Sequence, residues 1–272
     1  HYIHRTLIWP FRAQISKKKM PISIALFAMC FNIINSVINA ESIFKLRFAA
    51  MANELLTLGI DFNCAPVLDI ARATTHRFLR NRCYGLNKSD VIALGRVAYD
   101  ALKSNGVFPI IKHLPGHGFA SQDSHFELPV VYASKKELLA NDFAVFRAFC
   151  DAEIAMSAHV LFESIDPYSP ASTSKKLMDI IRNEIKFSGL LISDDISMAA
   201  LPGDIKKRTK NLIEAGNDVI LHCNGKLFEM KEIIYSGVVP NTLTLSRMAS
   251  VIEERKKIKH NNIKNVESSQ SS

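Results

Sequence analysis

The sequence predicts an α/β fold in which a parallel sheet of barrel type, (β/α)8, is covered by helices. Five short apolar runs of the 272-residue chain have the character of strands buried on both faces, and each precedes a helical pattern. Polar residues follow these runs, as they do at the carboxyl ends of barrel strands. No G-x-G-x-x-G or Walker loop follows any of them, so a nucleotide-binding doubly wound sheet is disfavoured.

Strand and helix patterns alternate along the chain. We expect strands at residues 62–69, 107–111, 154–160, 190–193 and 218–221. We expect helices at residues 41–58, 91–105, 135–150, 175–185 and 205–215. A barrel needs eight strands, so about five of its eight units are recognisable and we expect the barrel to be N-terminally incomplete.

Composition divides the chain into three segments. Residues 1–40 form an irregular N-terminal segment, residues 41–255 the barrel domain, and residues 256–272 a polar tail that we expect to be disordered. Within the first segment, residues 17–40 combine a basic patch, an apolar stretch and a final small residue, which resembles an export signal. Asn32 and Asn35 interrupt the apolar stretch, so we favour a buried or irregular segment over a signal or a membrane span.

The overall composition excludes several classes of protein. Hydrophobic residues make up 48% of the chain and charged residues 22%, which is typical of one folded domain with a sizeable core. The net charge is +8, but the Lys and Arg residues are scattered and do not alternate with aromatic residues, so nucleic-acid binding is not expected. Five cysteines, spaced singly and without zinc-ligand spacing, favour a reducing compartment and no bound metal.

The most informative stretch of the chain follows the expected strand at 107–111. Residues 112–118 read Lys-His-Leu-Pro-Gly-His-Gly, and Asp123 and His125 come soon after them. Titratable side chains on a Gly/Pro-rich loop after a buried strand are typical of an active site on a parallel α/β scaffold. Asp123 can orient the imidazole of His125 and raise its basicity, which suits proton transfer near neutral pH.

Asp194 and Asp195 follow the expected strand at 190–193. Two adjacent carboxylates at this position cannot both be core residues, because a buried unpaired charge is costly. We expect Asp195 to cap the next helix. We expect Asp194 to be catalytic, since such a carboxylate can attack a sugar carbon or stabilise a cationic transition state.

Three basic residues are candidates for holding a substrate. Lys112 and His113 lie at the end of an apolar strand, which favours a site over a solvated pair. Arg82 offers a planar set of donors suited to sugar hydroxyls or an acyl carbonyl, although a lone arginine is more often a surface residue.

Three further polar residues have weaker assignments. We expect His117, between two glycines, to brace its loop through hydrogen bonds to the main chain. His159 is more often a buried, hydrogen-bonded histidine than a catalyst. Asp69 could contact a substrate or bind its own loop, and the sequence leaves both roles open.

Together these motifs resemble those of the bacterial glycoside hydrolase family 3 β-N-acetylglucosaminidases. Residues 112–118 and 123–125 look like the family's K-H-[FL]-P-G-H-G…D-S-H signature, and residues 193–198 resemble its nucleophile segment. Further matching runs at residues 62–69, 82–85, 157–160 and 215–218 fall in the family's order. The resemblance extends from about Ala40 to Glu253.

The resemblance implies a (β/α) barrel that removes terminal β-linked N-acetylglucosamine with retention of configuration. It implies that Asp194 is the nucleophile and that His125, oriented by Asp123, is the general acid and base. The groups implied to hold the sugar and its acetamido group are Arg82, Lys112 and His113. It also implies action on muropeptides in the cytoplasm during cell-wall recycling, without a cofactor or metal. We expect a monomer whose partner is a small carbohydrate, with no membrane or nucleic acid involved.

The chain departs from the family pattern ahead of residue 41. Family members carry a strand ending D-Q-E-G-G there, which this sequence lacks, so we expect the first three β/α units to be missing, as in a truncated chain. One alternative function is therefore a non-catalytic remnant or sugar-binding pseudoenzyme. A second is a β-N-acetylglucosaminide phosphorylase, because a histidine acid/base tolerates an anionic nucleophile. A third is an exported binding protein cleaved after Ala40.

Overall fold

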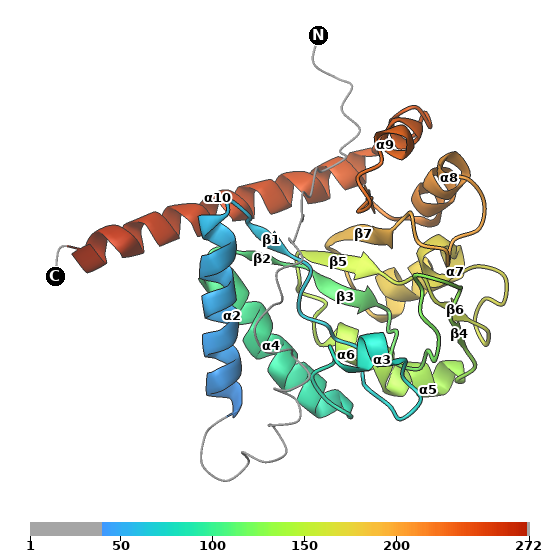
Figure 1. Ribbon diagram of the computed structural model, residues 1–272, viewed down its shortest axis with the longest axis horizontal. Coiled ribbons are helices and arrows are strands. Elements are labelled where there is room, and N and C mark those ends of the chain that lie inside the picture. The colour runs from blue at the N-terminus through green and yellow to red at the C-terminus, as the bar shows by residue number, and fades with distance from the viewer. Residues whose placement is uncertain (1–39, 271–272) are drawn as a thin grey trace.

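The computed structural model describes residues 40–270, with side chains from Glu41 to Ile258. The predicted irregular segment and export signal therefore lie outside the described residues, apart from Ala40. The described chain is an α/β fold in which the main sheet is parallel, as predicted (Figure 1). None of its helices is both long and apolar enough to cross a lipid bilayer.

Five parallel strand segments follow one another along the chain, and each overlaps a predicted strand, although β3 (Ile111–Leu114) begins where the strand predicted at 107–111 ends. The main sheet has the order β3-β5-β7-β8, with bounds Ile111–Leu114, Ile154–Ser157, Leu190–Asp195 and Val219–Leu221. The remaining segment is β1 (Phe62–Asn63), which pairs with β2 (Phe108–Pro109) just before β3. A bridge between Val67 and Lys112 continues this pairing. A small pair that the sequence did not predict is β4 (Val130–Val131) with β6 (Leu161–Phe162).

Helices connect and cover the strands. In chain order they are α2 (Ala40–Thr57), α3 (Arg77–Arg80), α4 (Lys88–Ser104), α5 (Lys135–Ala140), α6 (Asp142–Arg147), α7 (Lys175–Asp179), α8 (Ile205–Ala215), α9 (Leu227–Ile234) and α10 (Thr242–Gln270). A short 3-10 turn (Ala171–Thr173) precedes α7, and a π-helical turn (Ile180–Glu184) extends it. Each of the five predicted helices overlaps an observed one, because the apolar spacing that predicts a helix also gives it a face to bury.

Successive strand residues alternate between two cores, as the pleat of a strand requires. Ile111, Ala155 and Leu191 face the larger core, which contains residues of α4, α6 and α7. Their neighbours Ile110, Ile154 and Leu190 face a second core, to which α10 contributes Met248 and Val251. In Figure 1 the strands accordingly lie between α10 on one side and α4 and α6 on the other.

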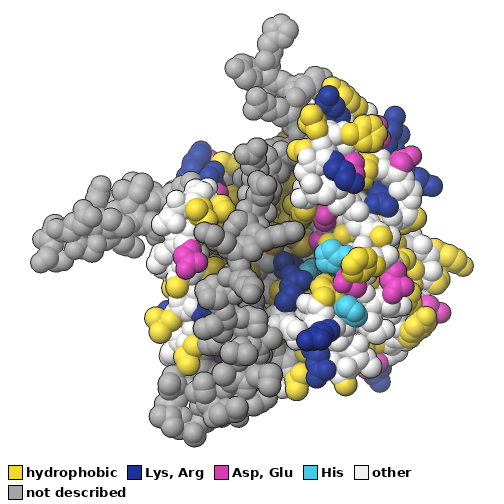
Figure 2. Space-filling view, in the orientation of Figure 1, with side chains coloured by type: hydrophobic (Ala, Val, Ile, Leu, Met, Phe, Trp, Pro, Cys, Tyr) yellow, Lys and Arg dark blue, Asp and Glu magenta, His cyan; other side chains and the backbone are white. Residues whose placement is uncertain are grey.

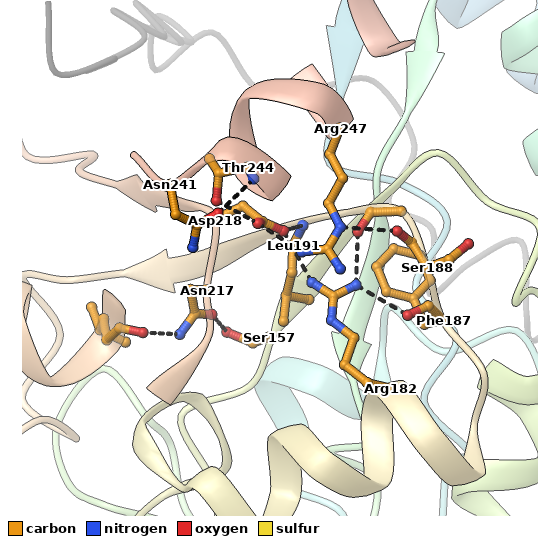
Figure 3. A network of polar contacts seen from close by, with 12 residues as sticks. Ser157, Arg182, Phe187, Ser188, Leu191, Asn217, Asp218, Asn241, Thr244 and Arg247 are labelled. Carbon is orange, nitrogen blue, oxygen red and sulfur yellow. Dashed lines mark hydrogen bonds and ion pairs between the residues drawn. The ribbon is translucent and has the colours of Figure 1, made fainter. Parts of the chain in front are cut away.

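A buried carboxylate attaches α10 to the sheet (Figure 3). The side chain of Asp218 is 2% exposed, and its two oxygens accept hydrogen bonds from four donors. These donors are Arg182, the N–H of Leu191, Thr244 and Arg247, at 3.0, 2.9, 2.8 and 2.9 Å. Because the donors come from the turn after α7, from β7 and from α10, this one residue holds three elements together.

The expected disordered tail is instead the second half of α10, which continues to Gln270. Residues 242–270 contain neither Gly nor Pro, so nothing in the chain interrupts the helix. Pairs of Glu and Lys three residues apart stabilise it, with Glu253–Lys256 at 2.6 Å and Glu254–Lys257 at 3.5 Å. Arg255 also forms an ion pair with Asp61, just before β1. Low hydropathy predicted disorder here, but these contacts stabilise the helix as far as Lys257, and no Gly or Pro interrupts it beyond that residue.

Removal of the Asp218 carboxylate is expected to destabilise the fold. We expect Asp218→Ala to lower the free energy of unfolding by about 3 kcal/mol, because two arginines, a hydroxyl and a backbone N–H lose their acceptor. Urea denaturation of the purified chain measures this change. Asp179→Ala removes an exposed carboxylate from α7 and serves as the control, with an expected change below about 0.5 kcal/mol. Equal effects of the two substitutions would contradict the role given to Asp218.

Candidate active site

The polar residues predicted at strand ends meet at one edge of the sheet. Parallel strands bring their carboxyl ends to the same edge, so β3 presents Lys112 and His113 there and β7 presents Asp194. Figure 2 shows His, Lys or Arg, and Asp or Glu side chains gathered near the centre of one face of the molecule. Among the side chains that the structure describes, no group of three or more His, Cys, Asp and Glu is placed to hold a metal ion.

An irregularity in β3 allows two adjacent residues to reach the site. Lys112 pairs with Met156 and Leu114 with Ser157 of β5, so His113 is an extra residue in the ladder. In a regular strand neighbouring side chains point to opposite faces, and the extra residue relieves this constraint. Burial and the nearby Arg82 guanidinium lower the pKa of Lys112, whereas the Asp194 carboxylate opposes that shift.

Asp69 orients the ring of His113 through a hydrogen bond to Nδ1. Its carboxylate is fully buried, with Oδ2 2.6 Å from Nδ1 of His113 and Oδ1 accepting the His117 N–H at 2.6 Å. Burial holds the pKa of His113 well below its ordinary value, so its ring is neutral at neutral pH. A neutral ring that donates from Nδ1 to Asp69 leaves Nε2 as an acceptor. The prediction that Asp69 binds its own loop is wrong, because its carboxylate binds β3 and the loop that follows it.

The prediction for His117 is wrong about which group braces the loop. Its backbone N–H donates to Asp69, but neither ring nitrogen has a hydrogen-bond partner among the described residues, although both are buried. The loop is held instead by close backbone packing at Gly118. A Cβ at this position would lie 2.1 Å from the carbonyl oxygen of Ile70, so only glycine fits.

Asp194 is a buried carboxylate that stays ionised. It is 8% exposed at the end of β7, and Oδ1 accepts the N–H of Asp195 at 2.8 Å. Burial raises the pKa of Asp194, but the imidazoles of His113 and His159, the Asp195 N–H and the Lys112 ammonium together bring it below its ordinary value. This is the protonation state that a nucleophile needs.

Asp195 does not cap the next helix as predicted. Its carboxylate accepts hydrogen bonds from the N–H and hydroxyl of Ser197, at 3.0 and 2.7 Å, and from the N–H of Cys223 at 3.2 Å. The N-terminal cap of α8 is Asp204, which accepts the Lys207 N–H at 2.7 Å. A turn separates β7 from α8, so the carboxylate nearest the strand stabilises that turn and the loop after β8.

Asp123 and His125 form a pair on the loop between β3 and β4. Asp123 Oδ1 lies 2.7 Å from Nδ1 of His125 and accepts the His125 N–H at 3.0 Å. Burial raises the pKa of Asp123, but these two bonds and the nearby imidazole lower it more, so the net shift is downward. The side chain of His125 is 50% exposed. The carbonyl of Ser124 accepts the N–H of Ala200 at 3.3 Å, which attaches this loop to the one that follows Asp194.

The two remaining candidates also lie where the sequence suggested. The positive charge of Arg82 acts on Asp69, Lys112 and His113, which places its guanidinium beside the site. His159 is confirmed as a buried, hydrogen-bonded histidine. Its Nδ1 lies 2.7 Å from the Ser172 hydroxyl and its Nε2 3.2 Å from the backbone oxygen of Asp195.

Comparison with known proteins identifies the family. The chain matches the glycosyl hydrolase family 3 N-terminal domain over residues 18–254. This protein belongs to glycoside hydrolase family 3. The resemblance predicted from the sequence motifs is therefore confirmed.

Curated relatives of this family 3 chain are named β-hexosaminidases. The protein from Alkalilimnicola ehrlichii is 34% identical over 178 residues, which are 64% of this chain and 51% of the relative. The protein from Vibrio cholerae is 34% identical over 202 residues, which are 72% of this chain and 60% of the relative. The chain thus spans about half the length of the curated relatives that it matches.

Solved structures of the family have the same fold. NagZ from Neisseria gonorrhoeae in complex with N-trifluoroacetyl-D-glucosamine matches with a TM-score of 0.73 and 30% identity, covering 84% of this chain and 66% of that one. A family 3 β-N-acetylglucosaminidase from Paenibacillus sp. matches with a TM-score of 0.77 and 26% identity, covering 87% and 46%.

Sequence reasoning missed two features of this family 3 site. The ring of Phe78 contacts the ring of His125, and a salt bridge of 2.6 Å joins Arg72 to the buried Asp142 beside the loop at Gly116. Asp142 and Arg72 are 70 residues apart in the chain. Neither feature belongs to a local motif, so no pattern in the sequence could have indicated it.

Stability is expected to fall in mild acid because the site contains buried imidazoles. Burial lowers the pKa values of His113, His117 and His159, so the unfolded chain binds protons before the folded chain does. The free energy of unfolding is then unaffected by these imidazoles above about pH 6.5, the ordinary histidine pKa, and it decreases as the pH falls below that value. His117→Leu should reduce this pH dependence by up to about 1.4 kcal/mol per pH unit.

Urea denaturation between about pH 7 and about pH 5 measures this slope. Phe119→Leu, a substitution of an untitratable residue on the same loop, is the matched control and should leave the slope unchanged. A slope for His117→Leu that equals the wild-type slope would show that this imidazole takes no part in the acid sensitivity.

Proposed function

We propose that this chain provides the active site of a retaining β-N-acetylhexosaminidase that removes terminal β-linked N-acetylglucosamine. The observation that carries the proposal is the ionised, buried Asp194 beside Lys112 and His113, with the Asp123–His125 pair on a separate loop. One group able to attack and another able to transfer a proton are the minimum for a retaining mechanism. The family and the names of its curated members support the same reaction.

In the first step, the Asp194 carboxylate attacks the anomeric carbon and forms a covalent bond to the sugar. The bond from that carbon to the glycosidic oxygen breaks, and protonated His125 gives its Nε2 proton to the departing oxygen. Asp123 holds Nδ1 of His125, so the tautomer is correct and the imidazolium is stabilised.

In the second step, water replaces the departed group. Neutral His125 removes a proton from the water molecule, whose oxygen attacks the anomeric carbon while the bond to Asp194 breaks. Two inversions give net retention. An imidazole in place of the usual second carboxylate serves the same transfer near neutral pH.

The sugar is held by groups with complementary hydrogen-bonding roles. Lys112 and Arg82 donate, while Nε2 of neutral His113 accepts from a hydroxyl. The related NagZ structure in complex with N-trifluoroacetyl-D-glucosamine supports an N-acylated amino sugar as the ligand. Muropeptides are the proposed natural substrates and the cytoplasm the proposed location. A reducing compartment is supported by the free thiols of the cysteines within the described residues, which are Cys64, Cys83, Cys150 and Cys223.

The five parallel strands are proposed to be five of the eight strands of a (β/α) barrel. Their chain order, their parallel pairing and the alternation between an outer and an inner core support this arrangement. The functional groups at the carboxyl ends are where barrel enzymes carry their sites. A monomer acting on a small carbohydrate, with no membrane or nucleic-acid partner, is the proposed working form.

Turnover of an aryl β-N-acetylglucosaminide tests the proposed function. We expect the chain to release the chromophore, and Asp194→Ala to lower kcat/KM by about 10³-fold or more, because the nucleophile is lost. Asp179→Ala, at an exposed position of α7, is the control and should retain full activity. Circular dichroism verifies that each variant is folded.

Two other outcomes would replace the proposal. A folded wild-type chain without activity would indicate a non-catalytic member of the family. A rate that depends on added phosphate, with a sugar phosphate as product, would indicate a phosphorylase, which the imidazole acid/base would also permit.

A further inference from the structure

The ring of Phe78 lies beside two imidazoles of the active site. Its centroid is 5.5 Å from that of His125, with the two rings at 87°, and 6.0 Å from that of His117, at 83°. Both are edge-to-face contacts, the geometry that aromatic rings prefer. Phe78 thus contacts two imidazoles, His117 and His125, that lie on the same loop between β3 and β4.

The helical turn that carries Phe78 is firmly anchored. Its neighbour Leu79 is fully buried. The N–H of His76 donates to the Ala120 carbonyl at 3.1 Å, and the Thr75 hydroxyl donates to the Gly118 carbonyl. Phe78 is therefore attached to the rigid part of the site rather than to the exposed segment around His125.

His125 has few other restraints. Its side chain is half exposed, and its one side-chain hydrogen bond within the described residues is to Asp123. A single bond at Nδ1 locates the ring but restrains its rotation weakly, because the outer torsion of histidine has broad minima. The contact with Phe78 supplies the second restraint that defines the plane of the ring.

We propose that Phe78 is a positioning residue for proton transfer by His125. Acting through the imidazole, it keeps Nε2 directed at the oxygen that receives or gives up the proton. This inference rests on the glycosidase function proposed above and adds a residue to its machinery. A purely structural residue would affect every step alike, whereas Phe78 should affect only the steps in which His125 transfers a proton.

The leaving group provides the test. An alkyl aglycone departs as a poor leaving group and needs the proton from His125, whereas a dinitrophenyl aglycone departs without it. We expect Phe78→Leu to lower kcat/KM for a methyl β-N-acetylglucosaminide by about tenfold or more, a part of the 10²- to 10⁴-fold that general acid catalysis supplies. For the dinitrophenyl glycoside we expect a change of less than about twofold.

Two further variants complete the design. Phe78→Tyr keeps the ring and should restore most of the lost activity on the methyl glycoside. Phe119→Leu removes a neighbouring ring that stacks on Arg72, and should not discriminate between the two substrates. Equal losses on both substrates for Phe78→Leu, or no loss on either, would overturn the proposal.

A measurement without turnover keeps this proposal distinct from the proposed function. The ring current of Phe78 should displace the proton resonances of the His125 imidazole, and Phe78→Leu should remove that displacement. If the wild-type chain hydrolyses neither glycoside, the proposed function fails, and the resonances alone decide whether Phe78 holds the ring. Resonances that are the same in both proteins would overturn the contact.

Discussion

Parallel pairing of β3, β5, β7 and β8 is the constraint on which the candidate active site depends. It brings the carboxyl ends of all four strands to one edge, so that the charges of Lys112 and Asp194, more than eighty positions apart, act on each other. Helices α4, α6 and α7 cover one face of the sheet, and α10 covers the other. An irregularity in β3 then lets two adjacent side chains reach this edge, because His113 is an extra residue in the ladder.

Three buried carboxylates each need partners that offset the cost of burying a charge, and the partners differ with the role of the carboxylate. Asp218 is neutralised by two arginines and joins α10 to the sheet, so its charge contributes to stability. Asp69 is held by an imidazole and a backbone N–H, and its charge orients His113. Asp194 accepts one backbone N–H and lies near the Lys112 ammonium, and its pKa is below its ordinary value, so it stays ionised.

The two halves of the proposed mechanism differ in rigidity. The nucleophile lies on a strand in the core, whereas the acid/base lies on a loop that is half exposed. That loop is attached to the turn after Asp194 by the Ser124–Ala200 bond and to α3 by the ring of Phe78. The geometry of proton transfer therefore depends on packing between loops. The geometry of nucleophilic attack depends instead on the strand that carries Asp194.

The sequence by itself determined the five parallel strands, the helices between them and the groups at the strand ends, because apolar periodicity and short motifs are local properties. It did not predict that α10 would continue to Gln270, that the backbone rather than the ring of His117 would brace its loop, or that Asp195 would stabilise a turn. Nor did it predict that Phe78 would contact His125. Only the tertiary structure decided these, because each depends on partners brought together by folding, whose spacing along the chain follows no pattern.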